Sequence, residues 1–259
     1  MPSQLEIDTI VKGIEISWTA WGKMRDERLV LGDVSFVKSE NGRGFERIFA
    51  VNIEENREFR VGQMIGEIKS GVLSNSMLIT PATKPENLAK ILSREGFGID
   101  DAAPCMLLAL GDYAGARECA DLNISEVADE VCLADWLRIV SGALFGCELI
   151  TLAQISDVLA LGNTRLYLGA VNGTPVTACM TIVDGGTSVL DMVATSGEHR
   201  RRGYASALID RALVDLRRAG MKTVSLRAEA DGVGVYKKLG FRECFRRVVA
   251  ACGSCAQGL

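Results

Sequence analysis

The chain has 259 residues, of which 48% are hydrophobic and 24% charged, and its formal net charge is -4. This composition is typical of a folded protein and excludes a disordered chain, while the negative charge argues against a protein that binds nucleic acid over its whole surface. The length favours two domains of about 120 to 140 residues each. No apolar run reaches the roughly 20 residues that cross a bilayer. The first residues lack the basic and apolar regions of a signal peptide, so we expect a cytoplasmic protein without a membrane partner.

The first half of the chain alternates helical and extended patterns. Apolar side chains recur at helical spacing over residues 5–21. Residues 85–94 begin with a proline and are followed by a glycine, as helices often are. The predicted helices of this half are 5–21, 59–68 and 85–94, and its predicted strands are 34–37, 46–51, 77–80 and 106–110. Residues 111–121 are rich in glycine and alanine and predict a linker.

The second half contains two strong hairpin signals, Asn172-Gly173 and Asp184-Gly185, each between apolar runs. Its predicted strands are 122–127, 165–171, 175–183, 189–195, 223–228 and 245–249, and its predicted helices are 133–145, 152–161, 205–218 and a short one that contains Tyr236. Strands and helices that mix in this way predict an α/β fold, with a mixed central sheet flanked by helices.

A weak internal repeat links the two halves. A strand, a short helix, Gly-Phe and a second strand occur as MLIT…NLAKILSREGF…CMLLAL and again as VSLRAE…GVGVYKKLGF…FRRVVA. Counted back from Gly-Phe, Leu92 takes the place of Tyr236. The repeat indicates two related folds, although two unrelated strand–helix–strand units could also produce it.

Three consecutive arginines, Arg200, Arg201 and Arg202, precede the predicted helix 205–218. Positive side chains at the positive end of a helix dipole are unfavourable on their own account. They suit a site where an anion docks, and Gly203 would let backbone N–H groups approach phosphate oxygens closely. The alternative is a solvated basic turn before an ordinary helix.

The second half resembles the GNAT acetyltransferase superfamily over roughly residues 120–250. The resemblance is carried by the R-x-x-G-x-A segment 200–205, which follows Val193-Ala194-Thr195, and by VYKKLGF at 235–241, in the family's order. The first half resembles the degenerate N-terminal domain of a tandem GNAT protein. We therefore expect a degenerate GNAT-like domain over residues 1–115 and an acetyltransferase domain over residues 120–259.

The resemblance implies acetyl-CoA as acyl donor and no metal. It places the pyrophosphate on backbone amides of residues 200–205, and the pantetheine arm and acetyl oxygen on exposed amides of a splayed strand. The implied cofactor-binding residues are Val193, Ala194, Thr195, Arg200, Arg201, Arg202, Gly203, Tyr204, Ala205 and Tyr236. An asparagine that the family often carries seven residues before the tyrosine is Glu229 here, which puts a side-chain contact to the cofactor at this position in doubt.

Acetyl transfer to an amine needs a base for the amine, donors for the tetrahedral oxyanion and a proton for the departing thiolate. Tyr236 is the candidate general acid, since a phenol of pKa near 10 can protonate a thiolate; the alternative is a core tyrosine with its hydroxyl at the surface. Asp191 and Glu229 are the candidate bases, with a water relay as the alternative. Strand alternation would put Asp191 on the same face as Val193. His199, the one histidine, fits a cofactor contact or solvent exposure better than the role of base.

The sequence thus predicts an N-acetyltransferase that transfers an acetyl group directly, in a ternary complex, to the primary amine of a small molecule or peptide. The alternative is a non-catalytic CoA-binding regulatory or scaffolding module. Trp136 and Phe145 could line the acceptor pocket, although apolar residues at this spacing more often belong to a core. The pair Cys252 and Cys255 provides only half of the ligands of a zinc site. We therefore expect these cysteines to be free thiols. The oligomeric state stays open, a homodimer included.

Overall fold

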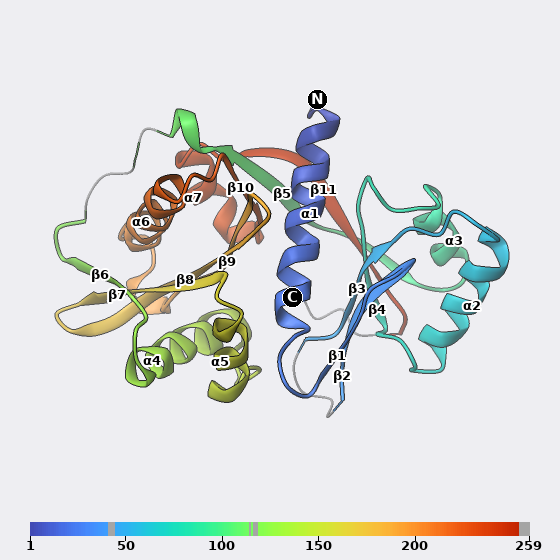
Figure 1. The fold of residues 1–259 in the computed structure, drawn as a ribbon, viewed down its shortest axis with the longest axis horizontal. Coiled ribbons are helices and arrows are strands. Elements are labelled where there is room, and N and C mark those ends of the chain that lie inside the picture. Colours follow the sequence, from blue (N-terminus) through green and yellow to red (C-terminus); the bar gives the residue numbers. More distant parts are fainter. Residues whose placement is uncertain (41–44, 114, 116–118, 254–259) are drawn as a thin grey trace. The chain divides into compact units, whose positions relative to one another are not determined.

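The computed structural model describes residues 1–40, 45–113, 115 and 119–253 (Figure 1). The chain divides into two compact units, one formed by Met1–Cys105 with Cys244–Leu259 and the other by Met106–Glu243. Both units combine helices with a mixed sheet, so the predicted α/β fold is confirmed. Cys255 lies outside the described residues.

Unit 1 begins with a helix whose N-terminus is capped by the Ser3 side chain, with Glu6 completing a capping box. Its elements are α1 (Gln4–Trp21), β1 (Glu27–Val30), β2 (Val34–Ser39), β3 (Arg47–Val51), α2 (Arg57–Lys69), β4 (Ser76–Ile79), α3 (Leu88–Arg94), the start of β5 (Gly98–Ala109) and β11 (Arg242–Ala251). Every predicted element of the first half is present. The sequence pattern missed β1, and it placed the start of β5 eight residues too late.

The strands of unit 1 are ordered β1-β2-β3-β4-β11-β5. Strands β1, β2 and β3 run antiparallel, and β4 is parallel to β3. Trp18 of α1 stacks on Phe49 of β3, whereas the adjacent Ile48 packs in a core with side chains of α2 and α3. Because neighbouring strand residues point to opposite faces, α1 covers one face of the sheet and α2 and α3 cover the other.

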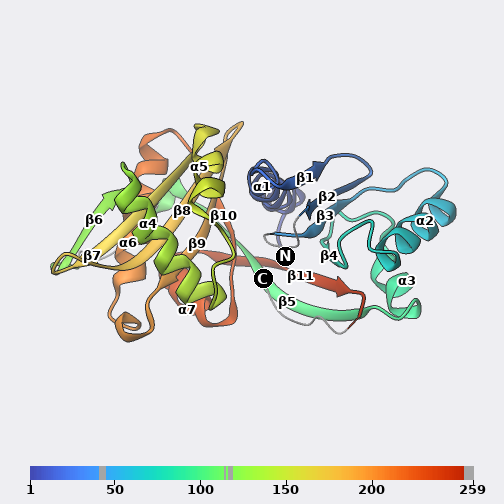
Figure 2. The ribbon, with the colours of Figure 1, turned by 90° about the horizontal axis from the view of Figure 1, so that it is seen from below.

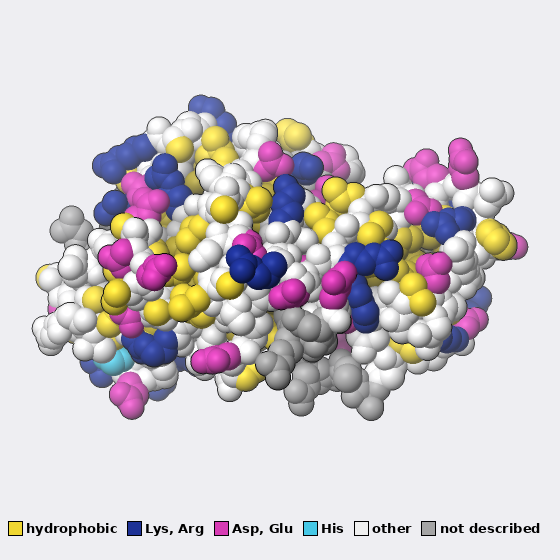
Figure 3. Space-filling model, turned by 60° about the horizontal axis from the view of Figure 1, so that its bottom comes forward, with side chains coloured by type: hydrophobic (Ala, Val, Ile, Leu, Met, Phe, Trp, Pro, Cys, Tyr) yellow, Lys and Arg dark blue, Asp and Glu magenta, His cyan; other side chains and the backbone are white. Residues whose placement is uncertain are grey.

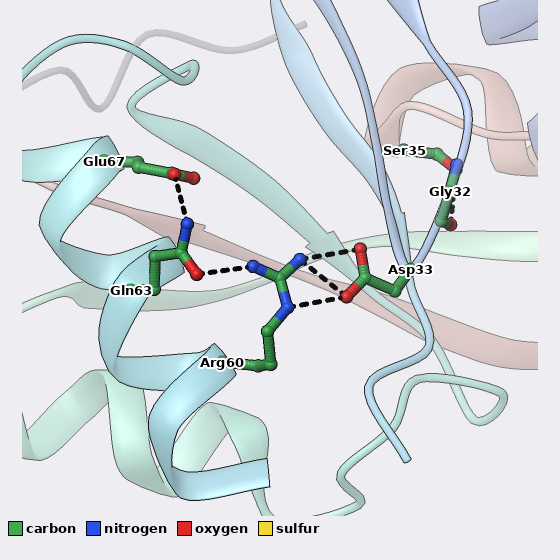
Figure 4. Close-up of polar contacts among 6 residues, drawn as sticks. All are labelled: Gly32, Asp33, Ser35, Arg60, Gln63 and Glu67. Carbon is green, nitrogen blue, oxygen red and sulfur yellow. Dashed lines mark hydrogen bonds and ion pairs between the residues drawn. The ribbon is translucent and has the colours of Figure 1, made fainter. Parts of the chain in front are cut away.

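A polar network fixes α2 on the β1–β2 turn of unit 1 (Figure 4). Both nitrogens on one edge of the Arg60 guanidinium donate to the Asp33 carboxylate, at 2.8 and 2.9 Å. The third nitrogen donates to Gln63 at 2.7 Å, and Gln63 in turn donates to Glu67. A bidentate pair of this kind fixes orientation as well as distance.

Unit 2 comprises the end of β5, β6 (Leu122–Glu126), α4 (Glu130–Val140), α5 (Leu152–Ala160), β7 (Thr164–Val171), β8 (Thr174–Asp184), β9 (Thr187–Thr195), α6 (Tyr204–Arg218), β10 (Thr223–Arg227) and α7 (Val233–Lys238). Its strand order is β6-β7-β8-β9-β10-β5. Both predicted hairpins form, and Asn172 and Gly173 take positive φ values of 49° and 79°, as a tight hairpin turn requires. Helices α4 and α5 lie on one side of this sheet and α6 on the other (Figures 1 and 2).

The predicted helix 133–145 is only partly regular. Helix α4 ends at Val140 and continues as a wider π-turn, Ser141–Phe145. Trp136 is fully buried, and its indole N–H donates to the Cys179 carbonyl at 3.0 Å. Trp136 is therefore a core residue and does not line a pocket, and only the half-buried Phe145 keeps access to solvent.

The predicted repeat has the same local structure in both places. Gly96 and Gly240 follow α3 and α7 with φ values of 89° and 92°. The next N–H group, of Phe97 or Phe241, donates to the carbonyl of Leu92 or Tyr236 at 3.0 Å in each case. The strands after these helices are exchanged: β5, which follows α3, neighbours β10 in unit 2, and β11, which follows α7, pairs with β4 in unit 1.

The surface carries charges of both signs, which are interspersed on the face shown in Figure 3. None of the helices within the described residues combines the length and the apolar character that crossing a membrane requires.

Candidate active site

Strand β9 carries a bulge near its C-terminal end. Ala178 of β8 faces Ala194, but Met180, two residues on, faces Asp191, so β9 holds one extra residue. Met192 lies in this bulge with a φ of 51°, and its N–H donates to the Asp191 carboxylate at 2.9 Å. The alternation that was expected to place Asp191 and Val193 on one face does not hold across the bulge, because the extra residue shifts the side-chain order.

Beyond the start of β9, its pairing with β10 stops. The parallel register joins Ser188 to Val224 and Val189 to Ser225 and goes no further, although β9 continues to Thr195 and β10 to Arg227. The unpaired part of β9 contains Val193, Ala194 and Thr195. Backbone groups on an edge without a partner strand are available to a ligand. We call residues 190–195, which come after the last pair, the open stretch of β9.

An ion pair bridges the two strands next to this opening. The Arg227 guanidinium donates to Asp191 at 3.0 Å, and both side chains are only 15% exposed. The second oxygen of Asp191 accepts the Met192 N–H group. Asp191 is therefore bound on both oxygens. Sequence reasoning did not identify Arg227, and an arginine at the end of an otherwise uncharged strand was the one signal for it.

The chain between β9 and α6 contains two residues with left-handed backbone conformations. After a short 3₁₀ turn, Gly197–His199, left-handed φ values occur at Arg201 (62°) and at Gly203 (88°). Helix α6 then begins at Tyr204, and its first intrahelical bond runs from the Ala207 N–H to the Gly203 carbonyl. The earlier N–H groups of the first turn have no carbonyl partner within the helix, and they point outward at the positive end of its dipole.

The side chains of this loop have different roles. Arg201 and Arg202 are exposed. Arg200 is used internally, since its guanidinium donates to the carbonyls of Thr195 and Ala143 at 3.2 and 3.4 Å. Tyr204 is buried, and its hydroxyl donates to Asp121 at 2.7 Å. The side chains of Arg200 and Tyr204 are thus hydrogen-bonded within the protein and support the loop.

Tyr236 is 8% exposed and packs edge-on against Phe241. Gly232 lies against its ring so closely that a Cβ at this position would be 2.9 Å from a ring carbon. Burial raises the pKa of Tyr236 above its usual range, and the nearby charges of Asp191 and Glu229 raise it further. The structure therefore brings the three predicted catalytic side chains into one neighbourhood, with Glu229 exposed at its edge.

His199 interacts with its own loop. Its Nδ1 lies 3.1 Å from the Ser196 hydroxyl, and its ring is 6.3 Å from that of Tyr204. Within the part of the chain that the structure describes, no three His, Cys, Asp or Glu side chains are grouped so that they could hold a metal ion.

Part of the chain matches a known protein family. Residues 162–243, which include β9, the loop before α6 and all of α7, match the family model described as "Acetyltransferase (GNAT) domain". No curated protein matches the chain.

Several solved structures share the fold over nearly the whole chain. A GCN5-related N-acetyltransferase from Kribbella flavida superposes with a TM-score of 0.70 at 17% identity, over 93% of this chain and 95% of its own. A second, from Sphaerobacter thermophilus, gives a TM-score of 0.61 at 15% identity, over 96% and 93%. A tandem GNAT protein from the clavulanic acid biosynthesis pathway gives 0.62 at 11% identity, over 96% and 95%. Residues 162–243 therefore match a GNAT acetyltransferase domain, and the chain shares its fold along nearly its whole length with structures that include a tandem GNAT protein.

Proposed function

We propose that this protein is an acetyl-CoA-dependent N-acetyltransferase that acetylates a primary amine of a small molecule or peptide. One observation carries the proposal: the open stretch of β9 leads within eight residues, from Thr195 to Gly203, to the free N–H groups at the start of α6. Acetyl-CoA has the matching shape, with an extended amide-containing arm that ends in a pyrophosphate. Members of the GNAT family use this donor.

In this proposal the acyl donor is held mainly by backbone groups. The amides of Val193, Ala194 and Thr195 meet the pantetheine arm, and those of residues 200–205 meet the pyrophosphate. The exposed Arg201 and Arg202 side chains add positive charge beside the phosphates. The site belongs to the half over residues 120–259. We propose that residues 1–115 are a degenerate GNAT-like domain, with one CoA site per chain.

The reaction is direct transfer in a ternary complex. The deprotonated amine nitrogen attacks the thioester carbonyl carbon, so that a C–N bond forms and the carbonyl oxygen becomes an oxyanion. Backbone N–H groups of the open stretch stabilise that oxyanion, which in other acyl-transfer enzymes is worth about 3 to 4 kcal/mol per donor. The C–S bond then breaks, and the Tyr236 hydroxyl donates its proton to the departing sulfur. Burial keeps the phenol protonated, and the same dry surroundings make the thiolate more basic.

The proton of the amine needs a separate acceptor. Asp191 is bound on both oxygens, by Arg227 and by the Met192 amide, and would have to give up one of these bonds to serve as base. Glu229 is exposed, and its charge acts on Tyr236. We therefore assign the role of base to Glu229, and we regard Asp191 as a structural residue that is bound by Arg227 and by the Met192 amide.

The test is release of free CoA from acetyl-CoA with a panel of primary amines, measured on the wild type and on Tyr236→Phe. Acetylation of at least one amine by the wild type, and a large loss in the variant, is expected. Binding of acetyl-CoA without turnover of any amine would instead indicate a CoA-binding regulatory or scaffolding module. Absence of CoA binding by the wild type would contradict the cofactor site itself.

A further inference from the structure

Two tyrosine–aspartate hydrogen bonds tie the segment before β6 to helix α6. The Tyr204 hydroxyl donates to Asp121 at 2.7 Å, and the Tyr113 hydroxyl donates to Asp210 at 2.6 Å. In the first pair the tyrosine is the first residue of α6, and in the second the aspartate lies in the middle of the helix. Tyr113 and Asp121 of the predicted linker are therefore attached to the helix whose N-terminus faces the proposed pyrophosphate site.

Asp121 is an acceptor for more than one neighbour. Besides Tyr204, the Cys119 thiol donates to it at 3.2 Å. The hydrogen bond from Tyr204 is the main cause of a pKa of Asp121 below its ordinary value, and the charge of Arg202 contributes a smaller part. Asp121 is thus a carboxylate that holds the Tyr204 hydroxyl and lies near an arginine of the loop.

The N-terminus of α6 has no side-chain cap, as is also the case for α2, α3 and α7, and it differs in this from three other helices. Side chains cap α1, α4 and α5, where Ser3, Asp129 and Thr151 each accept a backbone N–H of the first turn. Gly203 precedes α6 and has no side chain with which to do so. The first turn therefore keeps its N–H groups for a ligand, but it lacks the bond that would fix its position.

We propose that Asp121 is a positioning residue for CoA: through Tyr204 it holds the uncapped first turn of α6 in the orientation that receives the pyrophosphate. Tyr204 is only 3% exposed, so its ring is held by packing and its hydroxyl by Asp121. This role rests on the proposed function, since it presupposes that CoA binds at this turn.

The experiment measures the Kd for CoA by calorimetry in Tyr204→Phe and Asp121→Ala. Each variant loses the hydrogen bond, and we expect binding about three- to ten-fold weaker, the range that corresponds to one net hydrogen bond. The double variant should be no weaker than either single one, because both remove the same bond. Asp121→Asn keeps an acceptor oxygen and should retain wild-type affinity.

Tyr113→Phe is the matched control, because it removes the other tyrosine–aspartate bond between the same segment and the same helix. It should lower the melting temperature as Tyr204→Phe does, but leave the Kd for CoA unchanged. Equal loss of CoA affinity in both variants would show a general effect on α6 and overturn the positioning role.

A donor that lacks the pyrophosphate tests whether Tyr204→Phe acts on the orientation of the pyrophosphate or damages the rest of the site. S-acetylpantetheine has the arm but no pyrophosphate, so Tyr204→Phe should leave kcat/KM for this donor unchanged while lowering it for acetyl-CoA. An equal loss with both donors overturns the role, as does wild-type CoA affinity in Tyr204→Phe. A wild type that binds no CoA would overturn the proposed function itself, and this role with it.

Discussion

The two units build the same junction, from a bulged strand into a helix, and only one of them presents an opening. In unit 1, Ser35 faces Ala50 and Phe36 faces Ile48, so β3 holds one extra residue just as β9 does. A left-handed residue precedes the helix in each case, Asn56 with a φ of 45° before α2 and Gly203 with a φ of 88° before α6.

The two junctions differ in the chain that comes after the bulge. In unit 1 the chain beside β3 remains paired: the Ile53 N–H donates to the Lys84 carbonyl at 3.1 Å, and the Lys84 N–H donates to Val51 at 2.9 Å. The junction also carries Glu54 and Glu55 where unit 2 carries arginines. If the proposed function holds, the bulge alone does not make a donor site, and an unpaired strand edge and positive charge must accompany it.

The largest expected effect comes from blocking the junction in unit 2. Arg202→Glu combined with Gly203→Asp puts two negative side chains at the start of α6, and a non-glycine residue at a φ of 88° is strained. Strain of about 1 to 3 kcal/mol plus repulsion of phosphate predicts at least about 100-fold weaker CoA binding. Calorimetric titration with CoA measures this loss of affinity.

The matched control for this change is Asn56→Asp, which adds a negative charge at the equivalent position of unit 1. Its Kd for CoA should equal that of the wild type. Retained CoA binding in the unit 2 double variant would place the cofactor elsewhere.

The next largest effect concerns the repeated helix position, Tyr236 in α7 and Leu92 in α3. Tyr236→Phe should lower kcat by about 10²- to 10⁴-fold, the range for loss of a general acid, with little change in CoA binding. Leu92→Met, a volume-conserving change in the core of unit 1, should leave kcat unchanged. An undiminished kcat in Tyr236→Phe would show that another group protonates the sulfur.

The pH profile gives an independent check on the same residue. Because the pKa of Tyr236 is raised, the phenol stays in its donor form throughout the range below pH 10. The rate should therefore rise with pH as the substrate amine loses its proton, and it should not fall again before about pH 10. A decline near pH 8 would contradict the role of Tyr236 as the acid.

A smaller effect is expected from the ion pair beside the open stretch of β9. Arg227→Gln or Asp191→Asn leaves one partly buried charge without its partner, and we expect kcat/KM about ten-fold lower in each case. Exchanging the two residues, Asp191→Arg with Arg227→Asp, restores an ion pair and should recover part of the activity. If Asp191→Asn abolishes kcat and the exchange does not restore it, Asp191 is the base, not Glu229.

The last pair of substitutions, in unit 1, is expected to leave CoA binding unchanged. Glu54→Arg with Glu55→Arg gives the unit 1 junction the positive charge of its counterpart, but Ile53 and Lys84 still occupy the backbone edge. Calorimetric titration with CoA should still give one site per chain. A second site would show that charge alone separates the two junctions.

Much of the fold was predictable from periodicity and turn chemistry. Helices such as α6 show a regular apolar face, and Asn172-Gly173 specifies its hairpin locally. Strand β1 was missed because it is four residues long and begins Glu-Arg. The early part of β5 was missed because Asp100 and Pro104 are rare inside strands.

The candidate site was predictable where a local motif marks it, as at Arg200–Ala205 and Tyr236. The features that depend on distant partners were not. The bulge at Met192 has no sequence signal of its own, and the pairing of Asp191 with Arg227 depends on the register of two parallel strands. The attachment of Tyr204 to Asp121 joins positions 83 residues apart.

The exchanged strands also have a consequence for biosynthesis. Unit 1 is encoded in two separate stretches, and Ala250, near the end of the chain, is fully buried in its core beside residues made first. During synthesis, unit 1 therefore lacks β11 until unit 2 has been synthesised. A chain divided between β5 and β6 would yield two halves that each lack a strand of their own unit, so the two units must fold from one continuous chain.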